Sequence, residues 1–352
     1  MTSRMRLEIG QIPQVVRAIV EEGAAETARI AAAVRAAAPR GAVIVARGTS
    51  DHAGIYARYL IEGLLHVPTG LAAPSLTTVY GTPLDWRGLL LIGLSQSGQG
   101  PDVVAVTEAA RAGGALTIAV TNEPGSPLAA AADHVLLCRA GEERAVAATK
   151  TYVAELAAIA ALVAGVAGGD NITATLPRLP AALADVMAAA EAWLPTAEPL
   201  VEALAASDRA LVVSRGYNLP TALEVALKLK ETSRIFADGY SSADLLHGPV
   251  ALAGPAVPMV VFRPDGSMGR ALDETVERAM AAGARPWLIG GAELAGGGER
   301  RPRALSLPGD LPEVLTPLAY VLPGQLLAET VARRRGMDPD APIGLTKVTR
   351  TV

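Results

Sequence analysis

The stretch LVVSRGYNLPTALEVALKLKETSRIFADGYSSADLLHGPV (residues 211–250) decides the fold. It opens on Leu211 to Ser214, a short apolar run typical of a buried strand, and continues into a helix with Pro220 in its first turn, where proline is tolerated. The charged residues on that helix are Glu224, Lys228, Lys230 and Glu231. His247 follows in a His-Gly-Pro turn. A buried strand that leads into such a helix indicates an α/β fold.

Lysine is rare in this chain, which has only Lys150, Lys228, Lys230 and Lys347. Because arginine supplies nearly all other positive charge, a lysine suggests a task that arginine cannot perform. An amine can lose its proton and act as a base or form an imine, whereas guanidinium stays charged. Ordinary surface lysines in an arginine-biased sequence remain the alternative.

The composition bounds the class of protein. The 352 residues predict roughly two domains, and the hydrophobic content of 51% is ample for buried cores. A net charge of −4 and an aromatic content of 3% do not favour nucleic-acid binding. The start MTSRMRLEIG lacks the apolar core of a signal peptide, and the apolar stretch 156–169 is too short to span a bilayer. We therefore expect a cytoplasmic protein with no membrane partner.

Alternating strands and helices recur in both halves of the chain. In the first half, the expected strands are 42–46, 89–94, 115–121 and 134–138, with helices between them. At an offset of 168 residues, Arg47-Gly48 matches Arg215-Gly216, residues 89–98 match 257–266, and 117–123 match 285–291. A constant offset over three strand ends indicates a duplicated βαβ domain with parallel sheets.

These patterns predict a domain layout. We expect a helical segment at 1–40, a first α/β domain at 41–169 and a helical linker at 170–206. A second domain follows at 207–335, with a last strand near 304–307 and a long helix from about 312 to 335, and a tail at 336–352. Each domain is expected to have three layers, a parallel sheet between helices.

Two loops in the first half carry hydroxyl groups at strand ends. Ser95-Gln96-Ser97-Gly98 lies between a buried strand and a helix, where side-chain donors and the helix dipole favour an anion. Arg47-Gly48-Thr49-Ser50 is a second such loop. The alternative is a plain turn with serine helix caps. Neither loop is a nucleotide fingerprint, and the second half has Phe262-Arg-Pro-Asp-Gly266 instead, so we expect one phosphate site per chain.

Other candidates for chemistry are few. Glu231 could move protons on a substrate carbon, and His247 could act on a sugar ring oxygen. The plainer interpretations are a solvated helix-end glutamate and a turn histidine. The single cysteine, Cys138, follows an apolar run and is interpreted as a core thiol. No residues have metal-ligand spacing, and we expect neither a metal nor another cofactor.

Six segments in order resemble the sugar isomerase (SIS) family, and within it the isomerase part of glutamine–fructose-6-phosphate aminotransferase. They are 46–54 (ARGTSDHAG), 93–102 (GLSQSGQGPD), 142–152 (EERAVAATKTY), 214–231 (SRGYNLPTALEVALKLKE), 244–252 (DLLHGPVAL) and 338–349 (DPDAPIGLTKVT). The resemblance covers nearly the whole chain. It implies two tandem SIS domains, with sugar phosphate held by the two loops.

The resemblance also implies roles for individual residues. Glu231 would shuttle a proton between carbons 1 and 2, and His247 would open the sugar ring from across a homodimer interface. Lys347 would open fructose phosphate through a Schiff base, and Lys228 would lie beside the reacting oxygens. The family segment V-A-S-T-K corresponds to Val146-Ala147-Ala148-Thr149-Lys150, so Val146, Ala148 and Thr149 would contact the sugar.

Three departures from the family pattern bear on function. Gly100 replaces a phosphate-binding threonine, and Ala148 replaces a sugar-contacting serine. Nothing in the 352 residues resembles the glutaminase domain of the aminotransferase, so we expect no ammonia from glutamine. The favoured expectation is an enzyme that converts glucosamine 6-phosphate and water to fructose 6-phosphate and ammonia. A fructosamine-6-phosphate deglycase, a galactosamine-phosphate deaminase and a non-catalytic sugar-phosphate regulator remain alternatives.

Overall fold

The computed structural model describes residues 2–169, 171–291 and 302–347. Contacts within the chain divide it into two compact units, named here after their sheets. Of the described residues, the first-sheet unit holds 11–143, 150–169, 171–180 and 346–347. The second-sheet unit holds 2–10, 144–149, 181–291 and 302–345. The units are therefore interleaved along the sequence.

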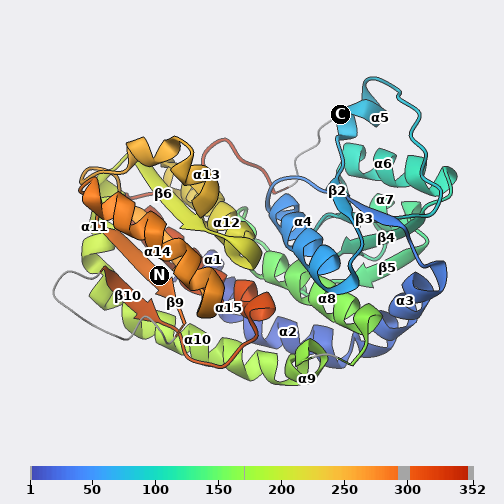
Figure 1. The fold of residues 1–352 in the computed structure, drawn as a ribbon, viewed down its shortest axis with the longest axis horizontal. Helices are drawn as coiled ribbons and strands as arrows, with labels where there is room; N and C mark the ends of the chain where they lie inside the picture. The colour runs from blue at the N-terminus through green and yellow to red at the C-terminus, as the bar shows by residue number, and fades with distance from the viewer. Residues whose placement is uncertain (1, 170, 292–301, 348–352) are drawn as a thin grey trace. The chain divides into compact units, whose positions relative to one another are not determined.

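The first sheet has five parallel strands in the order β2-β1-β3-β4-β5 (Figure 1). Its strands are β1 (Gly41–Val45), β2 (Thr69–Leu71), β3 (Leu89–Leu94), β4 (Leu116–Thr121) and β5 (His134–Leu137). The three central strands are nearly continuous aliphatic runs, as expected when helices cover both faces of a parallel sheet. On one face the core includes Val45, Leu91, Val103, Val106 and Trp86.

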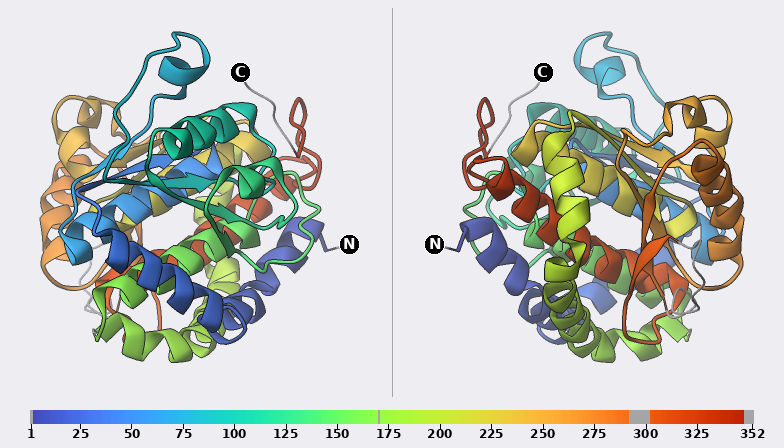
Figure 2. Two further views of the ribbon diagram at one scale, coloured as in Figure 1. Left: turned by 90° about the vertical axis from the view of Figure 1, so that its right-hand side faces the viewer. Right: turned by 90° about the vertical axis from the view of Figure 1, so that its left-hand side faces the viewer.

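Helices cover the first sheet on both sides. Those on one face are α3 (Ala24–Ala37), α4 (Thr49–Leu60, extended by a π-helical turn at Ile61–Leu65) and α8 (Lys150–Ala167). Those on the other are α5 (Pro74–Thr78), α6 (Pro101–Ala112) and α7 (Pro127–Ala131). Figure 2 (left) shows the sheet between α6 and α3. Helix α2 (Ile12–Glu21) packs against α8.

The second sheet repeats this strand order as β7-β6-β8-β9-β10, again all parallel. Its strands are β6 (Arg209–Ser214), β7 (Phe236–Ser241), β8 (Met259–Arg263), β9 (Pro286–Gly290) and β10 (Arg303–Ser306). β6 begins 168 residues after β1, the offset expected from the sequence. Two sheets with one topology confirm the predicted α/β fold with three-layer domains.

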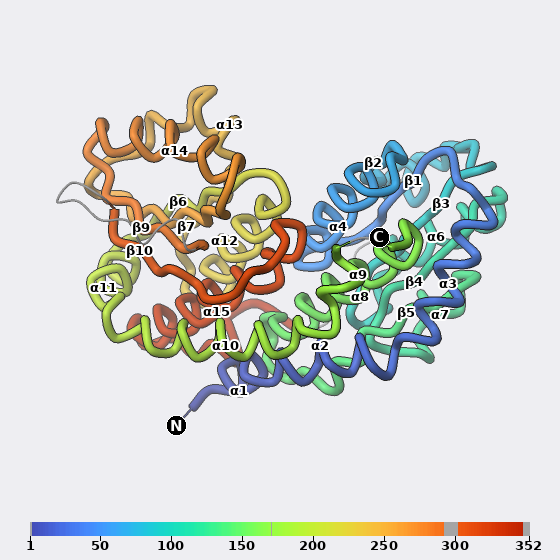
Figure 3. Tube along the Cα trace, turned by 60° about the horizontal axis from the view of Figure 1, so that its bottom comes forward, coloured from blue at the N-terminus to red at the C-terminus, as the bar shows by residue number. Residues whose placement is uncertain are grey.

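Helices flank the second sheet in the same way. One side has α11 (Glu198–Ala206), α12 (Leu219–Ser233) and α15 (Thr316–Arg334). The other has α13 (Ser242–Leu246) and α14 (Gly266–Ala281). Helices α12 and α15 run side by side (Figure 3). Short 3₁₀ turns at Gly216–Asn218, Pro249–Leu252 and Glu313–Leu315 lead into or out of these helices.

Distant parts of the sequence complete the second-sheet unit. Helix α1 (Arg4–Gly10) is anchored by Ser3, whose hydroxyl donates to Glu329 Oε1 at 2.7 Å, and by Asp340, which accepts from the Arg4 and Met5 amides. Helix α10 (Leu179–Trp193) leads into α11 through a 3₁₀ turn at Leu194–Ala197, whereas α9 (Asn171–Thr175) and the 3₁₀ turn at Leu176–Arg178 belong to the first-sheet unit. Contacts across more than 300 residues thus hold the amino terminus in place.

Two short elements differ from the sequence expectation. The edge strands β2 and β7 were not predicted, because β2 has only three residues and β7 (FADGYS) contains Asp238 and Gly239, which are poor strand formers. The expected loop 47–50 is also shorter than predicted: helix α4 begins at Thr49, so Thr49 and Ser50 lie in its first turn.

Two helices, Lys150–Ala167 and Glu313–Arg334, are long and apolar enough to cross a membrane by length and composition. Both are mostly buried within the protein, as are the core helices of globular folds. The first is longer than the apolar stretch recognised in the sequence, because it starts at Lys150. Its burial is explained by packing against α3, α4 and the first sheet.

We predict that Gly324→Ala destabilises the second-sheet unit. A Cβ at Gly324 in α15 would lie 2.3 Å from Val225 Cγ2 and 3.1 Å from Phe262 Cζ. Overpacking costs about 1–3 kcal/mol, more than the gain of at most about 1 kcal/mol in helix propensity. Thermal unfolding followed by circular dichroism should show a melting temperature several degrees lower.

The control for this change is Gly10→Ala, also at a helical glycine, where a Cβ meets nothing within 4 Å. We expect its melting temperature to equal or slightly exceed that of the unsubstituted protein. If Gly324→Ala were as stable as the control, the close approach of α15 and α12 would be wrong.

Candidate active site

The loop after β3 carries two serine hydroxyl groups. The Gly98 amide donates to the Ser95 carbonyl and to Ser95 Oγ at 3.1 Å, and the Gln99 amide donates to Ser97 Oγ at 3.3 Å. Both serine oxygens act here as acceptors, and no acceptor for either hydroxyl proton occurs among residues 2–169, 171–291 and 302–347. The two hydroxyls can therefore donate to a ligand.

Gly98 is required for this loop. Its φ of +60° is left-handed, and a Cβ there would lie 2.1 Å from Ser126 Oγ. The Gln96 carbonyl accepts from the Asn122 amide at 3.1 Å, which ties the loop to the end of β4. Since the carboxyl ends of parallel strands form the usual ligand edge, this loop is placed where ligands bind in such sheets.

The loop after β1 is held to the same edge by an ion pair. Arg47 Nε lies 2.6 Å from Asp102 Oδ2, and Asp102 is 1% exposed in the first turn of α6. In the sequence, Asp102 appears only as the last residue of the quoted segment 93–102. Ser50 donates from Oγ to Glu155 Oε1 at 2.8 Å, inside the unit, so its proton is used there. Gly48 has a φ of 55° and precedes α4.

A cavity of about 620 Å³ opens beside the Ser95 loop. It is lined by Gln96, Ser97, Asn122, Glu123, Arg139, Gly141, Glu142, Glu143 and Lys347. Asn122 shapes one wall, because its side chain accepts from the Ala140 amide and donates to the Gly141 carbonyl, both at 2.8 Å. The structure thus brings together two predicted phosphate-loop residues and the predicted imine-forming lysine.

Glu143 fixes Lys347 in this cavity. Lys347 Nζ lies 2.7 Å from Glu143 Oε2, and the same carboxylate accepts from the Thr151 hydroxyl at 2.7 Å and amide at 3.1 Å. The Glu143 side chain is fully buried, whereas that of Lys347 is 25% exposed. Sequence reasoning missed Glu143, although it lies in the quoted segment 142–152, because its partner is 204 positions away.

The segment 144–149 belongs to the second-sheet unit. Glu8 accepts from the Ala145 amide, the Val146 amide donates to the Asp340 carbonyl, and the Thr149 carbonyl accepts from Gln325 Nε2. Ala148 and Val146 are half-buried, and Thr149 is fully buried. These contacts fix the backbone of the segment that was predicted to contact the sugar.

Three charged residues of α12 form a buried cluster. Lys228 Nζ lies 2.5 Å from Glu231 Oε2 and 3.3 Å from Glu224 Oε1. The Lys228 and Glu224 side chains are 0% exposed, and that of Glu231 is 22% exposed. The spacings of three and four residues place both carboxylates on the lysine's face of the helix. Glu231 is therefore positioned by the cluster and still reaches solvent.

The cluster determines the charge of Lys228. Burial opposes the charged form, but the carboxylates of Glu224 and Glu231 outweigh it and raise the pKa of Lys228 above its ordinary value of 10.5. Lys228 is thus a permanent cation at neutral pH. A raised pKa does not favour a base or imine-former at this position, and the role of Lys228 beside the reacting oxygens stays a prediction.

The remaining candidates differ in setting. His247 is exposed just after α13 and takes no part in the hydrogen bonds of the α12 cluster. Cys138 is buried next to β5, and burial raises the pKa of its thiol well above the usual range, with Glu155 and Glu26 adding to the effect. This confirms the core thiol. Lys150 is buried and donates to Gln11 Oε1 and the Glu142 carbonyl, and Lys230 is exposed.

We predict that Lys228→Met lowers the free energy of unfolding by about 3–5 kcal/mol, because it leaves two carboxylates without their buried cation. Lys230→Met is the control, since it removes the same charge from an exposed site two positions away and should change stability by about 0.5 kcal/mol or less. Urea unfolding measures both. Equal stability of the two variants would contradict the cluster's role.

The pH dependence of stability follows from the same pKa. A raised pKa in the folded state makes the Lys228 contribution complete below about pH 10.5, and the contribution is lost as pH rises above that value. The difference in stability between the unsubstituted protein and Lys228→Met should therefore persist at pH 9 and shrink only in stronger alkali.

Comparison with known proteins places this architecture in a family. The SIS domain model matches residues 38–165 and 203–293. The chain is 38% identical over 314 residues to glutamine–fructose-6-phosphate aminotransferase (isomerizing) of Zymomonas mobilis, covering 86% of this chain and 51% of that protein. Identity to the enzyme of the same name from Methanothermobacter thermautotrophicus is 37% over 306 residues, with coverages of 86% and 50%. The chain spans about half the length of these curated relatives.

Solved structures give the same result. A Silicibacter pomeroyi protein, named by inference as a phosphosugar isomerase, is 36% identical with a TM-score of 0.86, covering 96% of this chain and 100% of that one. The C-terminal domain of glucosamine-fructose-6-phosphate aminotransferase from Francisella tularensis is 25% identical with a TM-score of 0.87, at coverages of 97% and 98%. With two matched segments and two sheets of one topology, the chain belongs to the SIS domain family.

Proposed function

We propose that this protein is an amino-sugar phosphate deaminase and isomerase, with glucosamine 6-phosphate and water as substrates and fructose 6-phosphate and ammonia as products. The observation that carries the proposal is the cavity shared by the Ser95 loop and Lys347, with hydroxyl donors for a phosphate and an amine in one site. The likeness to aminotransferases that act on fructose 6-phosphate supports this choice of sugar.

The phosphate is assigned to the loop after β3. Ser95 and Ser97 offer hydroxyl protons, and the Gln96 side chain lines the same cavity. Arg47, Gly48 and Thr49 form the neighbouring loop, and Arg47 supplies positive charge, although it is already paired with Asp102. Ser50 is assigned mainly to holding α4 through Glu155. One phosphate per chain remains the expectation, because Asp265 in the corresponding second-half loop would repel an anion.

Proton transfer is assigned to Glu231. In the open-chain sugar, its carboxylate takes the proton from carbon 2 and returns it to carbon 1, which converts the aldehyde and amine into a ketose imine. Water adds to carbon 2 and ammonia leaves, so the carbon skeleton keeps its oxidation level. Lys228 holds one Glu231 oxygen at 2.5 Å and keeps positive charge beside the reacting oxygens.

Ring opening is assigned to His247 and Lys347. His247 acts on the ring oxygen of the aldose, and we propose that it does so in the partner subunit of a homodimer, because it is exposed and absent from the α12 cluster. Lys347 acts on the ketose: once it leaves Glu143 and loses its proton, its amine would add to carbon 2, and the carbonyl oxygen would leave as water when the imine forms. A cytoplasmic location, the absence of a cofactor and the absence of a nucleic-acid partner remain predictions.

The choice of sugar has a second candidate. Ala148 is half-buried where the family has a serine, and Gly100 precedes α6 where the family has a threonine. Both changes remove a hydroxyl and make room, which favours a substituted or epimeric sugar such as a fructosamine 6-phosphate or galactosamine 6-phosphate. A pure regulator would not need the buried Lys228 cluster.

The first test is ammonia release from glucosamine 6-phosphate, galactosamine 6-phosphate and a fructosamine 6-phosphate. We expect release from the first, and a fall of about 100-fold or more in Glu231→Gln because a general base is lost. Glu277→Gln, an exposed glutamate of α14, is the control and should retain full activity. Binding of all three sugars without any released amine would favour the regulator, and release from the third alone would identify a deglycase.

The second test concerns the shared site. Glu231→Gln and His247→Ala chains, each inactive alone, are expected to regain activity when mixed, because a hybrid dimer contains one intact combination of Glu231 and His247. If chains exchange at random, about half of the dimers are hybrids, and one of the two sites in each hybrid is intact. Up to about a quarter of full activity should therefore return. No recovery, with chain exchange verified by native mass spectrometry, would refute the contribution of His247 across subunits.

A further inference from the structure

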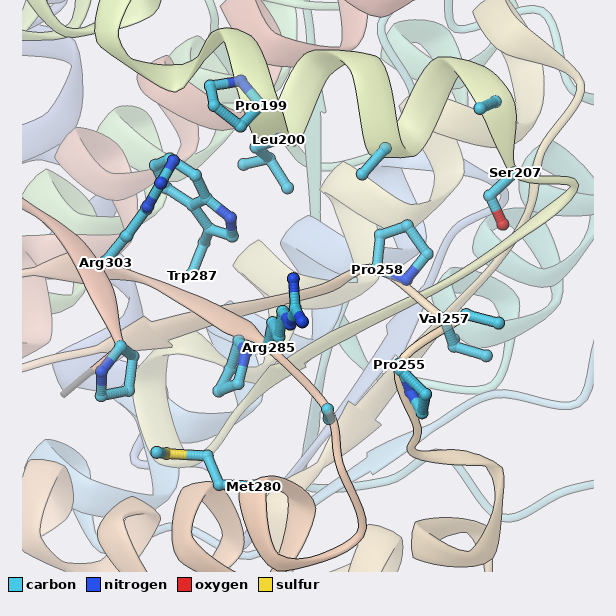
Figure 4. A pocket seen from close by; sticks show the side chains of 16 residues that line it. Pro199, Leu200, Ser207, Pro255, Val257, Pro258, Met280, Arg285, Trp287 and Arg303 are labelled. Atoms are coloured by element: carbon cyan, nitrogen blue, oxygen red, sulfur yellow. The ribbon is translucent and has the colours of Figure 1, made fainter. Parts of the chain in front are cut away.

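A second cavity, of about 580 Å³, lies in the second-sheet unit and is lined by residues other than those of the α12 cluster. It is bounded by α11 and by the segments that lead into β8, β9 and β10, all at the amino-terminal ends of strands (Figure 4). Its volume is within the range of about 300–1,000 Å³ that is usual for small-molecule sites. No role in the proposed reaction is assigned to it.

The walls of this cavity are apolar and rigid. Leu200 and Met280 face it from α11 and α14, and Trp287 of β9 forms one side. Five prolines also line it, at positions 199, 255, 258, 286 and 302. Proline has a fixed φ and no amide proton, so these segments lose little conformational entropy when they enclose a ligand. The edge-to-face contact of Trp287 with Trp193, at 6.2 Å between centroids, further fixes the indole.

Positive charge converges on this apolar cavity. Arg303 lies over the Trp287 ring, 5.2 Å from its centroid, and Arg285 projects between Trp287 and Pro258 (Figure 4). Within the described ranges, which omit residues 292–301, neither guanidinium forms an ion pair with a carboxylate. The two arginines thus place positive charge at this cavity, although the net charge of the whole chain is −4.

The corresponding edge of the first sheet provides an internal comparison. A smaller cavity of about 320 Å³ lies there, lined by Pro39, Leu89, Leu116, Arg111 and Asp133 among others. Its arginine is neutralised, because Arg111 Nε lies 2.9 Å from Asp133 Oδ1. The two domains share one topology but differ at the amino-terminal ends of their strands. In the first-sheet cavity the arginine is paired with an aspartate. In the second-sheet cavity, among the described residues, the two arginines have no acidic partner and lie beside an apolar wall.

We propose that the second-sheet cavity binds a soluble organic anion with a flat apolar body. The apolar part would lie against Leu200, Met280 and the prolines, and the anionic group would pair with Arg285 and Arg303. Arginine suits this task because it binds carboxylate, sulfonate or phosphate through two parallel hydrogen bonds. The site is independent of the proposed catalytic function, and it can be tested whether or not the protein releases ammonia.

The probe pair for the test is 8-anilinonaphthalene-1-sulfonate and N-phenyl-1-naphthylamine, which share one aromatic skeleton and differ in the sulfonate. We expect the anionic probe to bind once per chain, with saturable quenching of tryptophan fluorescence that is lost in Trp287→Phe. The uncharged probe should bind about tenfold more weakly or worse, because it cannot pair with arginine. Equal affinities, or binding without saturation, would overturn the proposal.

The arginines are tested by the double variant Arg285→Gln/Arg303→Gln, in which both substituted residues are exposed and the fold should be retained. Affinity for the anionic probe should fall about tenfold or more, while affinity for the uncharged probe should stay the same. Arg40→Gln/Arg111→Gln removes the same net charge near the first-sheet cavity and serves as the control. An equal loss in the control, or no loss in either variant, would refute the assigned site.

Discussion

The buried contact of Lys228 with Glu224 and Glu231 is the constraint on which the second-sheet unit depends. Two carboxylates and one ammonium lie on one face of α12, and Lys228 and Glu224 have no solvent exposure. Removing charge from water is expensive, so such a cluster persists only where geometry satisfies each member. The neighbouring α15 must pack closely enough to exclude water, which explains why Gly324 approaches Val225. Packing and electrostatics are therefore coupled along this helix pair.

One topology supports different chemistry at corresponding edges. After β3 the chain has Ser95-Gln96-Ser97-Gly98, and Gln96 and Ser97 of this loop line a cavity. After β8, the corresponding strand, it has Pro264-Asp265-Gly266, with an acidic side chain and no serine. The strands and flanking helices are retained, because burial on both faces constrains them, whereas loops at strand ends are constrained mainly by ligands. The two sheets thus share one topology while the loops after β3 and β8 differ in charge and in hydroxyl groups.

Local patterns in the sequence were enough to predict most of the fold. β3 has its predicted bounds of 89–94, since an uninterrupted apolar run between turn residues can form little else. β7 was missed because FADGYS has the composition of a loop and becomes a strand only by pairing with β6. Pairing with the neighbouring strand therefore determines the conformation of residues 236–241, as is common at sheet edges.

The candidate site was predictable as a set of loops, but not as a set of partners. The Ser95 loop and Lys347 were identified from residue type and family resemblance, and the structure places both at one cavity. Glu143 and Asp102 were not assigned as partners of Lys347 and Arg47, because each pairing joins residues far apart in the sequence. The burial of Lys228 between Glu224 and Glu231 was not predicted either, since residue spacing alone cannot show that water is excluded from the cluster.

The anchoring of Ser3 on Glu329, and of the Arg4 amide on Asp340, has a consequence for biosynthesis. A ribosome adds about 5–20 residues per second, so residues 3 and 4 are made tens of seconds before their partners Glu329 and Asp340. During that interval the apolar face of α1, with Met5 and Ile9, has no second-sheet unit to cover it. Helix α1 is therefore covered late in synthesis, only after residues 329–340 have been made.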